Sequence, residues 1–241
     1  ERHIRDAGIS FRIAGDQREH PWPLGCLPLV IEGSEWAALS AGIVQRAELM
    51  EAILADVYGD GRLVAEGLLP AAIVAGTPEF LHPLHGVTPP GGHYLKLYAA
   101  DLGRGPDGRW QVLADRTQAP SGLGWALENR MVLARTFPDF FQDLHVERLP
   151  AFFQAFRDGL ALGAERVDPR ICLLTSGPYS STYVEQAALA RYLGLMLVEG
   201  DDLVMRDGRL HVRTVSGLKR ADALWRRIDS DFLDPLELNP A

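Results

Sequence analysis

The feature that most constrains the fold is a strand–helix–strand pattern in the last third of the chain. A continuously apolar segment, ICLL at 171–174, is followed by the small-residue turn TSGP. The next segment, 180–193, has a helical composition, with Ser or Thr available as a cap at its start and Gly194 after its end. A second apolar segment, LMLV at 195–198, completes the pattern. Because a helical connection joins two buried strands in parallel, this region predicts a parallel α/β unit.

An antiparallel hairpin is predicted in the middle of the chain. The segments YLKLYAADL and GRWQVLADRT are rich in strand-forming residues, and the Asp107-Gly108 turn signal lies between them. Helical periodicity predicts helices over residues 125–135 and 149–163, and either one helix or a broken pair over residues 36–57.

The predicted fold class is therefore α/β. An α+β lobe with the antiparallel hairpin is expected over residues 1–165, and a parallel α/β domain over residues 166–241. The helix at 149–163 is expected to bridge the two.

The composition limits the classes of partner. The chain is 47% hydrophobic and 23% charged, which is typical of a globular protein with a core. Its formal net charge is -8 and no block of Lys and Arg offers a track for phosphates, so a nucleic-acid partner is not expected. No apolar run approaches the ~20 residues that span a bilayer. The sequence predicts a soluble, cytoplasmic protein with no membrane partner.

Two carboxylates on neighbouring predicted strands are the main chemical feature. Asp101 lies near the end of the first strand and Asp115 at the end of the second. If the two side chains converge, they either share a proton or bind a hard divalent cation such as Mg²⁺. Arg116 would favour the cation, because a cation and an arginine together neutralise a phosphate tail. The alternative is structural: Asp101 caps a turn, and Asp115 and Arg116 form a surface pair.

Several stretches resemble one enzyme family over almost the whole chain. They include PWPLGCLPLVI, DLGRGPDGRWQVLADRTQAPSGLGWALENR, LLTSGPYSSTYVEQAALARYLG and RRIDSDFLDPLEL. These stretches resemble the N-terminal portion of the circularly permuted ATP-grasp family, which is related to glutathionylspermidine-synthase-like ligases. Such enzymes activate a carboxylate as an acyl phosphate, which an amine then attacks.

The resemblance implies a set of site residues in the catalytic lobe. The expected metal ligands are Asp101, Asp115 and Thr117. Thr117 stands at a position where the family usually has Asn, so Gln118 or Asn129 is the alternative third ligand. Arg116 and Arg130 would steady phosphate charge as catalytic residues. The expected nucleotide-binding residues are Ser121, Gly122, Gly124 and Asn129, since a loop rich in glycine lets the backbone approach a phosphate.

The region from residue 166 resembles a pre-ATP-grasp domain on the substrate side. The expected substrate-binding residues are Ser176, Gly177, Tyr183, Glu185, Arg226, Arg227 and Asp229. For Tyr183 and Glu185 the alternative is an exposed first helical turn, where an acid is favoured by the helix dipole.

The resemblance also implies that the chain is incomplete as an enzyme. ATP and Mg²⁺ are expected as cofactors only in the complete enzyme, with small-molecule or peptide carboxylates and amines as substrates. A complementing lobe or a homo-oligomer would supply the rest of the site. The rival hypothesis is a non-catalytic binding module that recognises a peptide or a polyamine.

Overall fold

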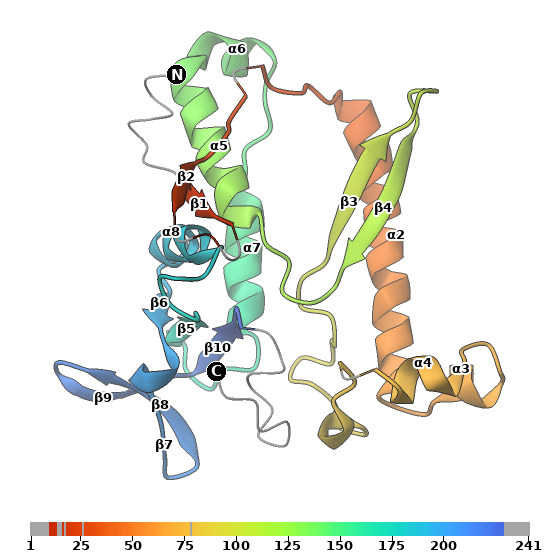
Figure 1. The fold of residues 1–241 in the computed structure, drawn as a ribbon, viewed down its shortest axis with the longest axis vertical. Coiled ribbons are helices and arrows are strands. Elements are labelled where there is room, and N and C mark those ends of the chain that lie inside the picture. Colours follow the sequence, from red (N-terminus) through yellow and green to blue (C-terminus); the bar gives the residue numbers. More distant parts are fainter. Residues whose placement is uncertain (1–9, 14–15, 17, 26, 78, 229–241) are drawn as a thin grey trace. The chain divides into compact units, whose positions relative to one another are not determined.

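The computed structural model describes residues 10–13, 16, 18–25, 27–77 and 79–228. The predicted α/β class is confirmed, since helices alternate with small antiparallel and parallel sheets. The chain forms two compact units, the first from residues 1–29 with 121–241, the second from residues 30–120. Figure 1 shows the elements of each unit.

The second unit is built from one long helix and a hairpin. Its elements are α2 (Gly33–Val57), α3 (Arg62–Ala65), α4 (Ala71–Ala75), the 3₁₀ helix η1 (His82–Leu84), β3 (Ala99–Arg104) and β4 (Trp110–Arg116). The hairpin turns where predicted, with Gly108 at a φ of 78°. Glu35 of α2 accepts hydrogen bonds from Trp110 and Arg104 on the hairpin. Among the described residues of this unit only Pro120 is buried.

The first unit contains the parallel sheet. Its elements are β1 (Ser10–Arg12), β2 (Glu19–Pro21), α5 (Leu123–Thr136), α6 (Pro138–Asp143), α7 (Pro150–Ala161), β5 (Ile171–Leu174), α8 (Tyr183–Leu193), β6 (Met196–Val198), η2 (Gly200–Asp202), β7 (Leu203–Arg206), β8 (Arg209–Thr214), β9 (Gly217–Arg220) and β10 (Ala223–Arg226). The sheet has the order β10-β5-β6, and both pairings are parallel. The predicted strand–helix–strand unit is thus β5, α8 and β6.

The core of the first unit surrounds this sheet. All four residues of β5 are buried. Cys172 and Val198 of the sheet share a cluster with Val212 of the antiparallel β7-β8-β9 sheet. On α7, Phe156 contacts Trp225 of β10 with ring centroids 4.8 Å apart. Burial of large apolar side chains of this kind supplies the main driving force for folding.

The compact units divide the chain differently from the predicted boundary at residue 165. Residues 121–165 belong to the same unit as the parallel sheet, while residues 30–120 form the other unit. The physical reason is tertiary packing: α5 packs on α8, and α7 packs on β10. Neither contact is visible in local sequence patterns. The helix predicted over residues 149–163 is present as α7, and the domain boundary at residue 165 stays a prediction.

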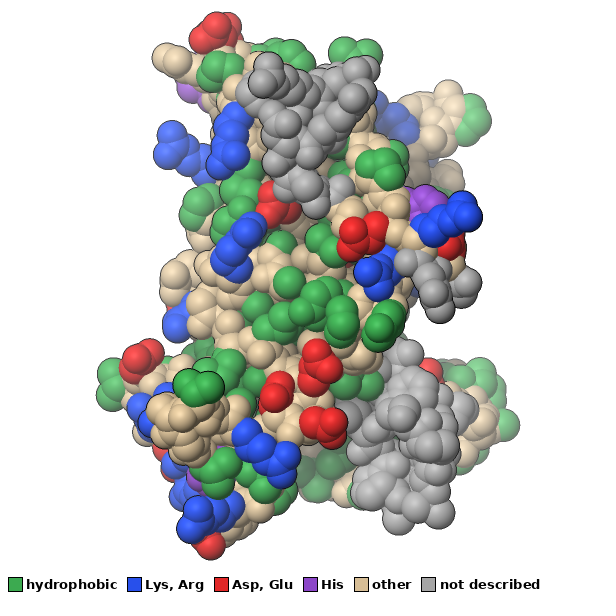
Figure 2. Space-filling model, turned by 60° about the vertical axis from the view of Figure 1, so that its left-hand side comes forward, with side chains coloured by type: hydrophobic (Ala, Val, Ile, Leu, Met, Phe, Trp, Pro, Cys, Tyr) green, Lys and Arg blue, Asp and Glu red, His purple; other side chains and the backbone are tan. Residues whose placement is uncertain are grey.

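None of the helices in the described part of the chain is long and apolar enough to cross a membrane. Figure 2 shows one face of the molecule, on which hydrophobic side chains gather in the middle and side chains of both charges lie on either side. Neither sign of charge dominates the coloured part of this face.

Candidate functional site

The register of the hairpin separates the two predicted metal ligands. Asp101 lies opposite Ala114, and Asp115 lies opposite Ala100. Residues directly opposite in an antiparallel pair point to the same face, and successive residues alternate between faces. Asp101 and Asp115 therefore point to opposite faces of the hairpin, and the expectation that they converge is corrected.

Each carboxylate instead has its own arginine. Arg46 of α2 donates to both oxygens of Asp115, at 2.6 and 2.8 Å, and the hydroxyl of Tyr98 donates to the first of them at 2.6 Å. The hydrogen bonds from Arg46, then that from Tyr98, lower the pKa of Asp115 to about 2. Asp101 accepts from Arg116 at 2.7 Å, and both side chains are about half exposed.

The metal set as predicted is therefore not assembled in this structure. Thr117 is exposed just beyond β4. In the described ranges, no group of three or more His, Cys, Asp or Glu side chains is placed to hold a metal ion. Arg116, predicted to steady phosphate charge, is the partner of Asp101. The alternative surface pair of Asp115 with Arg116 is wrong, because Asp115 pairs with Arg46.

The predicted phosphate loop is already occupied by a carboxylate. The backbone N–H groups of Gly122 and Gly124 both donate to Oε1 of Glu185, at 2.5 and 3.2 Å. Gly122 has a φ of 116°, which an L side chain rarely adopts. Ser121 is exposed beside it. In this structure these amides bind a side chain of α8, and the assignment of the loop to nucleotide binding stays a prediction.

Glu185 is among the most buried polar residues of the described chain. Its exposed fraction is 1%, so the exposed-first-turn alternative is wrong for this residue. Burial raises the pKa of Glu185, while the Gly122 and Gly124 amides and the charge of Arg227 oppose that rise. A guanidinium nitrogen of Arg227 lies 4.0 Å from Oε2 of Glu185, and the Arg227 side chain is only 4% exposed. Two residues predicted to bind substrate thus form a buried ion pair.

The remaining predicted residues of α5 hold other segments. The indole Nε1 of Trp22 donates to Oδ1 of Asn129 at 2.8 Å. Arg130 donates to the backbone carbonyl of Glu147 at 2.7 Å. In the structure these contacts attach flanking segments to α5.

On the predicted substrate side, Ser176 is exposed, and the N–H of Gly177 donates to the hydroxyl of Thr175 at 3.1 Å. Arg226 is exposed at the end of β10. Asp229 lies outside the described residues.

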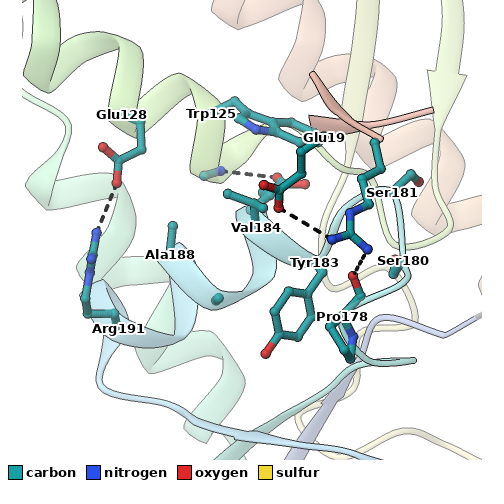
Figure 3. A pocket seen from close by; sticks show the side chains of 14 residues that line it. Glu19, Trp125, Glu128, Pro178, Ser180, Ser181, Tyr183, Val184, Ala188 and Arg191 are labelled. Atoms are coloured by element: carbon teal, nitrogen blue, oxygen red, sulfur yellow. Dashed lines mark hydrogen bonds and ion pairs between the residues drawn. The ribbon is translucent and has the colours of Figure 1, made fainter. Parts of the chain in front are cut away.

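A pocket of about 490 Å³ lies beside α8, within the first unit (Figure 3). Three of the predicted residues, Gly124, Tyr183 and Glu185, line it. The lining also includes residues that sequence reasoning missed: Arg12, Glu19, Trp125, Glu128, Pro178, Ser180, Ser181, Val184, Ala187, Ala188 and Arg191.

Two strands near the N-terminus bring charged groups to this pocket. Arg12 of β1 lies 3.6 Å from Glu19 of β2 and donates to the carbonyl of Pro178 at 2.7 Å. The rings of Trp22 and Trp125 stack with centroids 4.9 Å apart, which joins this segment to α5. No local signal connects residues near 12 with residues near 180, so the sequence alone did not reveal this side of the pocket.

Comparison with known proteins identifies the family of this chain. The model of the family described as circularly permuted ATP-grasp type 2 matches residues 28–241. The uncharacterized protein Rv2567 of Mycobacterium tuberculosis is 45% identical over 225 residues, which cover 92% of this chain and 26% of that protein. The uncharacterized protein sll0335 of Synechocystis is 38% identical over 237 residues, which cover 97% of this chain and 49% of that protein.

The chain thus spans between about a quarter and a half of the length of these relatives. The match includes the hairpin of the second unit as well as α5, α8 and the parallel sheet of the first. The chain belongs to the circularly permuted ATP-grasp type 2 family.

Proposed function

We propose that this chain is part of an ATP-dependent carboxylate–amine ligase of the peptide-forming type, which acts through an acyl phosphate. The observation that carries the proposal is the family match over residues 28–241, which includes the hairpin with Asp115 and the α5 and α8 residues that line the pocket, although Arg12 and Glu19 lie before it. Since the relatives are two to four times as long, the proposal concerns the complete protein, to which this chain contributes a part.

ATP and Mg²⁺ are the proposed cofactors of the complete protein. Within this chain, Asp101 and Asp115 point to opposite faces of the hairpin and each is bound by an arginine, so the two do not fit a shared Mg²⁺ site. No chemical step is therefore assigned to a metal on these two residues. Small-molecule or peptide carboxylates and amines are the proposed substrates, and a complementing lobe or a second copy would complete the site.

Asp115 provides the test, because its role in structure can be separated from a role in chemistry. In a protein that joins this chain to the additional region of its relatives, Asp115→Asn and Arg46→Gln both remove the same ion pair. If Asp115 acts only in folding, the two variants should lose stability and ATP-dependent ADP release alike. If Asp115 belongs to the ATP site, Asp115→Asn should abolish ADP release while Arg46→Gln retains much of it. An unchanged rate in Asp115→Asn would contradict a role of this residue in ATP turnover.

A non-catalytic module that binds a peptide or a polyamine is the second candidate. One observation favours it: the pocket is formed entirely by residues of the first unit. Ligand binding in this pocket, combined with an absence of ADP release by the complete protein, would support the module over the ligase.

A further inference from the structure

The floor of the pocket is a stripe along one face of α8. Val184, Ala187, Ala188 and Arg191 are spaced at three- and four-residue steps, and all four line the pocket. Residues at such spacings lie on one face of a helix. At 1.5 Å per residue, the stripe from Val184 to Arg191 is about 10 Å long. It offers small apolar contacts between two charged ends.

The two ends present opposite charges to solvent. At one end, Glu19 is 56% exposed whereas its partner Arg12 is 23% exposed and also donates to Pro178. At the other end, Arg191 is 69% exposed whereas its partner Glu128 is 13% exposed. Figure 3 shows Glu19 beside Val184 near the start of α8, and Arg191 opposite Glu128 towards the end of the helix. The accessible group is therefore a carboxylate at the first end and a guanidinium at the second.

We infer that this pocket binds a short peptide as a zwitterion, with the peptide's ammonium group at Glu19 and its carboxylate at Arg191. The peptide would share these groups with their present partners: Glu19 lies 3.6 Å from Arg12, and Arg191 donates to Glu128 and to the hydroxyl of Tyr192, each at 3.2 Å. An arginine also binds a carboxylate through two parallel donors, which favours a carboxylate at Arg191.

The size of the pocket matches this class of ligand. An extended peptide advances about 3.3–3.6 Å per residue, so about three residues span the apolar stripe. A volume of about 490 Å³ lies within the range of small-molecule sites. The hydroxyl groups of Ser180, Ser181 and Tyr183, all in the lining, can donate to or accept from peptide groups.

Ligands with one kind of charge fit less well. A polyamine would place an ammonium against Arg191, and a dicarboxylate would place an acid against Glu19. Like charges at such distances repel, so each would lose the contact at one end. The inference rests on the proposed function only where it makes the peptide an acceptor substrate, because binding itself needs neither ATP nor another lobe.

The test uses the 241-residue chain without nucleotide and three probes of nearly equal size: trialanine, N-acetyltrialanine and trialanine amide. Titrations are followed by calorimetry and by tryptophan fluorescence, since Trp125 lines the pocket. Trialanine should bind saturably. The acetylated and amidated peptides should each bind about tenfold more weakly or worse, as expected for the loss of one charged hydrogen bond. An absence of saturable trialanine binding, or equal affinity for all three probes, would overturn the inference.

Two variants then test which pocket residue binds each end of the peptide. Glu19→Gln should weaken trialanine binding about tenfold while changing little the binding of N-acetyltrialanine, which has no ammonium. Arg191→Gln should do the same for trialanine but leave trialanine amide almost unaffected. The matched controls are Glu66→Gln and Arg206→Gln, both at exposed positions that do not line the pocket, and both should bind like the unchanged chain. If Glu19→Gln and Arg191→Gln behave like the controls, the inference is overturned, whereas the ligase proposal is tested separately by ADP release.

Discussion

The Cγ atom of Glu185 lies 2.6 Å from the position that a Cβ atom would take on Gly124. No real Cβ contact is that short, so α5 approaches α8 this closely only because residue 124 is a glycine. The same approach lets the Glu185 carboxylate reach the N–H groups of Gly122 and Gly124. The glycines of the SGLG segment thus serve helix packing and a buried carboxylate.

Gly124→Ala should destabilise the chain by about 1–3 kcal/mol, because the added methyl group would overpack the contact with Glu185 and Leu189. The free energy of unfolding from urea titration measures this effect. Gly159→Ala in α7 is the matched control, since a Cβ there meets nothing within 4 Å. The control should stabilise the chain by about 0.5–1 kcal/mol. If Gly124→Ala left the free energy of unfolding unchanged, this result would contradict the close packing of α5 on α8.

Glu185→Gln should change how stability depends on pH. Burial raises the pKa of Glu185 in the folded state, so the folded protein binds its proton more tightly than the unfolded chain does. The wild-type chain should therefore lose stability relative to Glu185→Gln as the pH rises from the ordinary pKa of 4.5 through the raised value. Above that value the difference should be constant.

Urea unfolding at a series of pH values gives this difference directly. Glu66→Gln is the control, because the exposed Glu66 should give a difference that does not vary with pH. A difference between wild type and Glu185→Gln that moves in the opposite direction would show that the carboxylate is stabilised in its charged form.

Arg46→Gln should raise the pKa of Asp115 from about 2 towards the ordinary 3.8, since Arg46 is the largest cause of the lowering. A lowered pKa means that the pair stabilises the fold above pH 3.8, and that this stabilisation is lost as the pH falls through about 2. The carboxyl chemical shift of Asp115, followed by NMR against pH, measures the change. Arg62→Gln removes an exposed pair with Asp60 and should leave Asp115 unaffected. An Asp115 titration that is the same with and without Arg46 would refute the ion pair.

Trp22 and Asn129 should be energetically coupled. Trp22→Phe keeps an aromatic ring against Trp125 but removes the donor to Asn129, and Asn129→Ala removes the acceptor. A double-mutant cycle on the free energy of unfolding should give a coupling of about 0.5–1.5 kcal/mol. Strict additivity of the two changes would mean that the segment around Trp22 is not held on α5 by this hydrogen bond.

The local elements were predictable from the sequence. The Asp107-Gly108 turn gave the hairpin of β3 and β4, and the alternation of apolar strand, helix and apolar strand gave β5, α8 and β6. Gly194 ends α8 with a φ of 66°, as a glycine after a helix should. In each case the signal lies within a few residues of the structure it produces.

The positions of Asp101 and Asp115 in the sequence did not predict which face of the hairpin each side chain takes. Sequence distance from a strand end does not say which face a side chain takes, because a shift of one residue in register reverses every side chain. The observed register, with Asp115 opposite Ala100, puts Asp115 beside Tyr98 and within reach of Arg46. Asp101 is left on the other face with Arg116.

The sequence by itself determined the class of the fold, its main helices and strands, and its resemblance to the ATP-grasp family, because these depend on local periodicity and on continuous motifs. Tertiary structure alone decided that Glu185 is buried against Gly122 and Gly124, and that Arg12 and Glu19 meet α8 at the pocket. Those contacts join residues about 60 to 170 positions apart, and they exist only because packed helices and strands bring distant segments together.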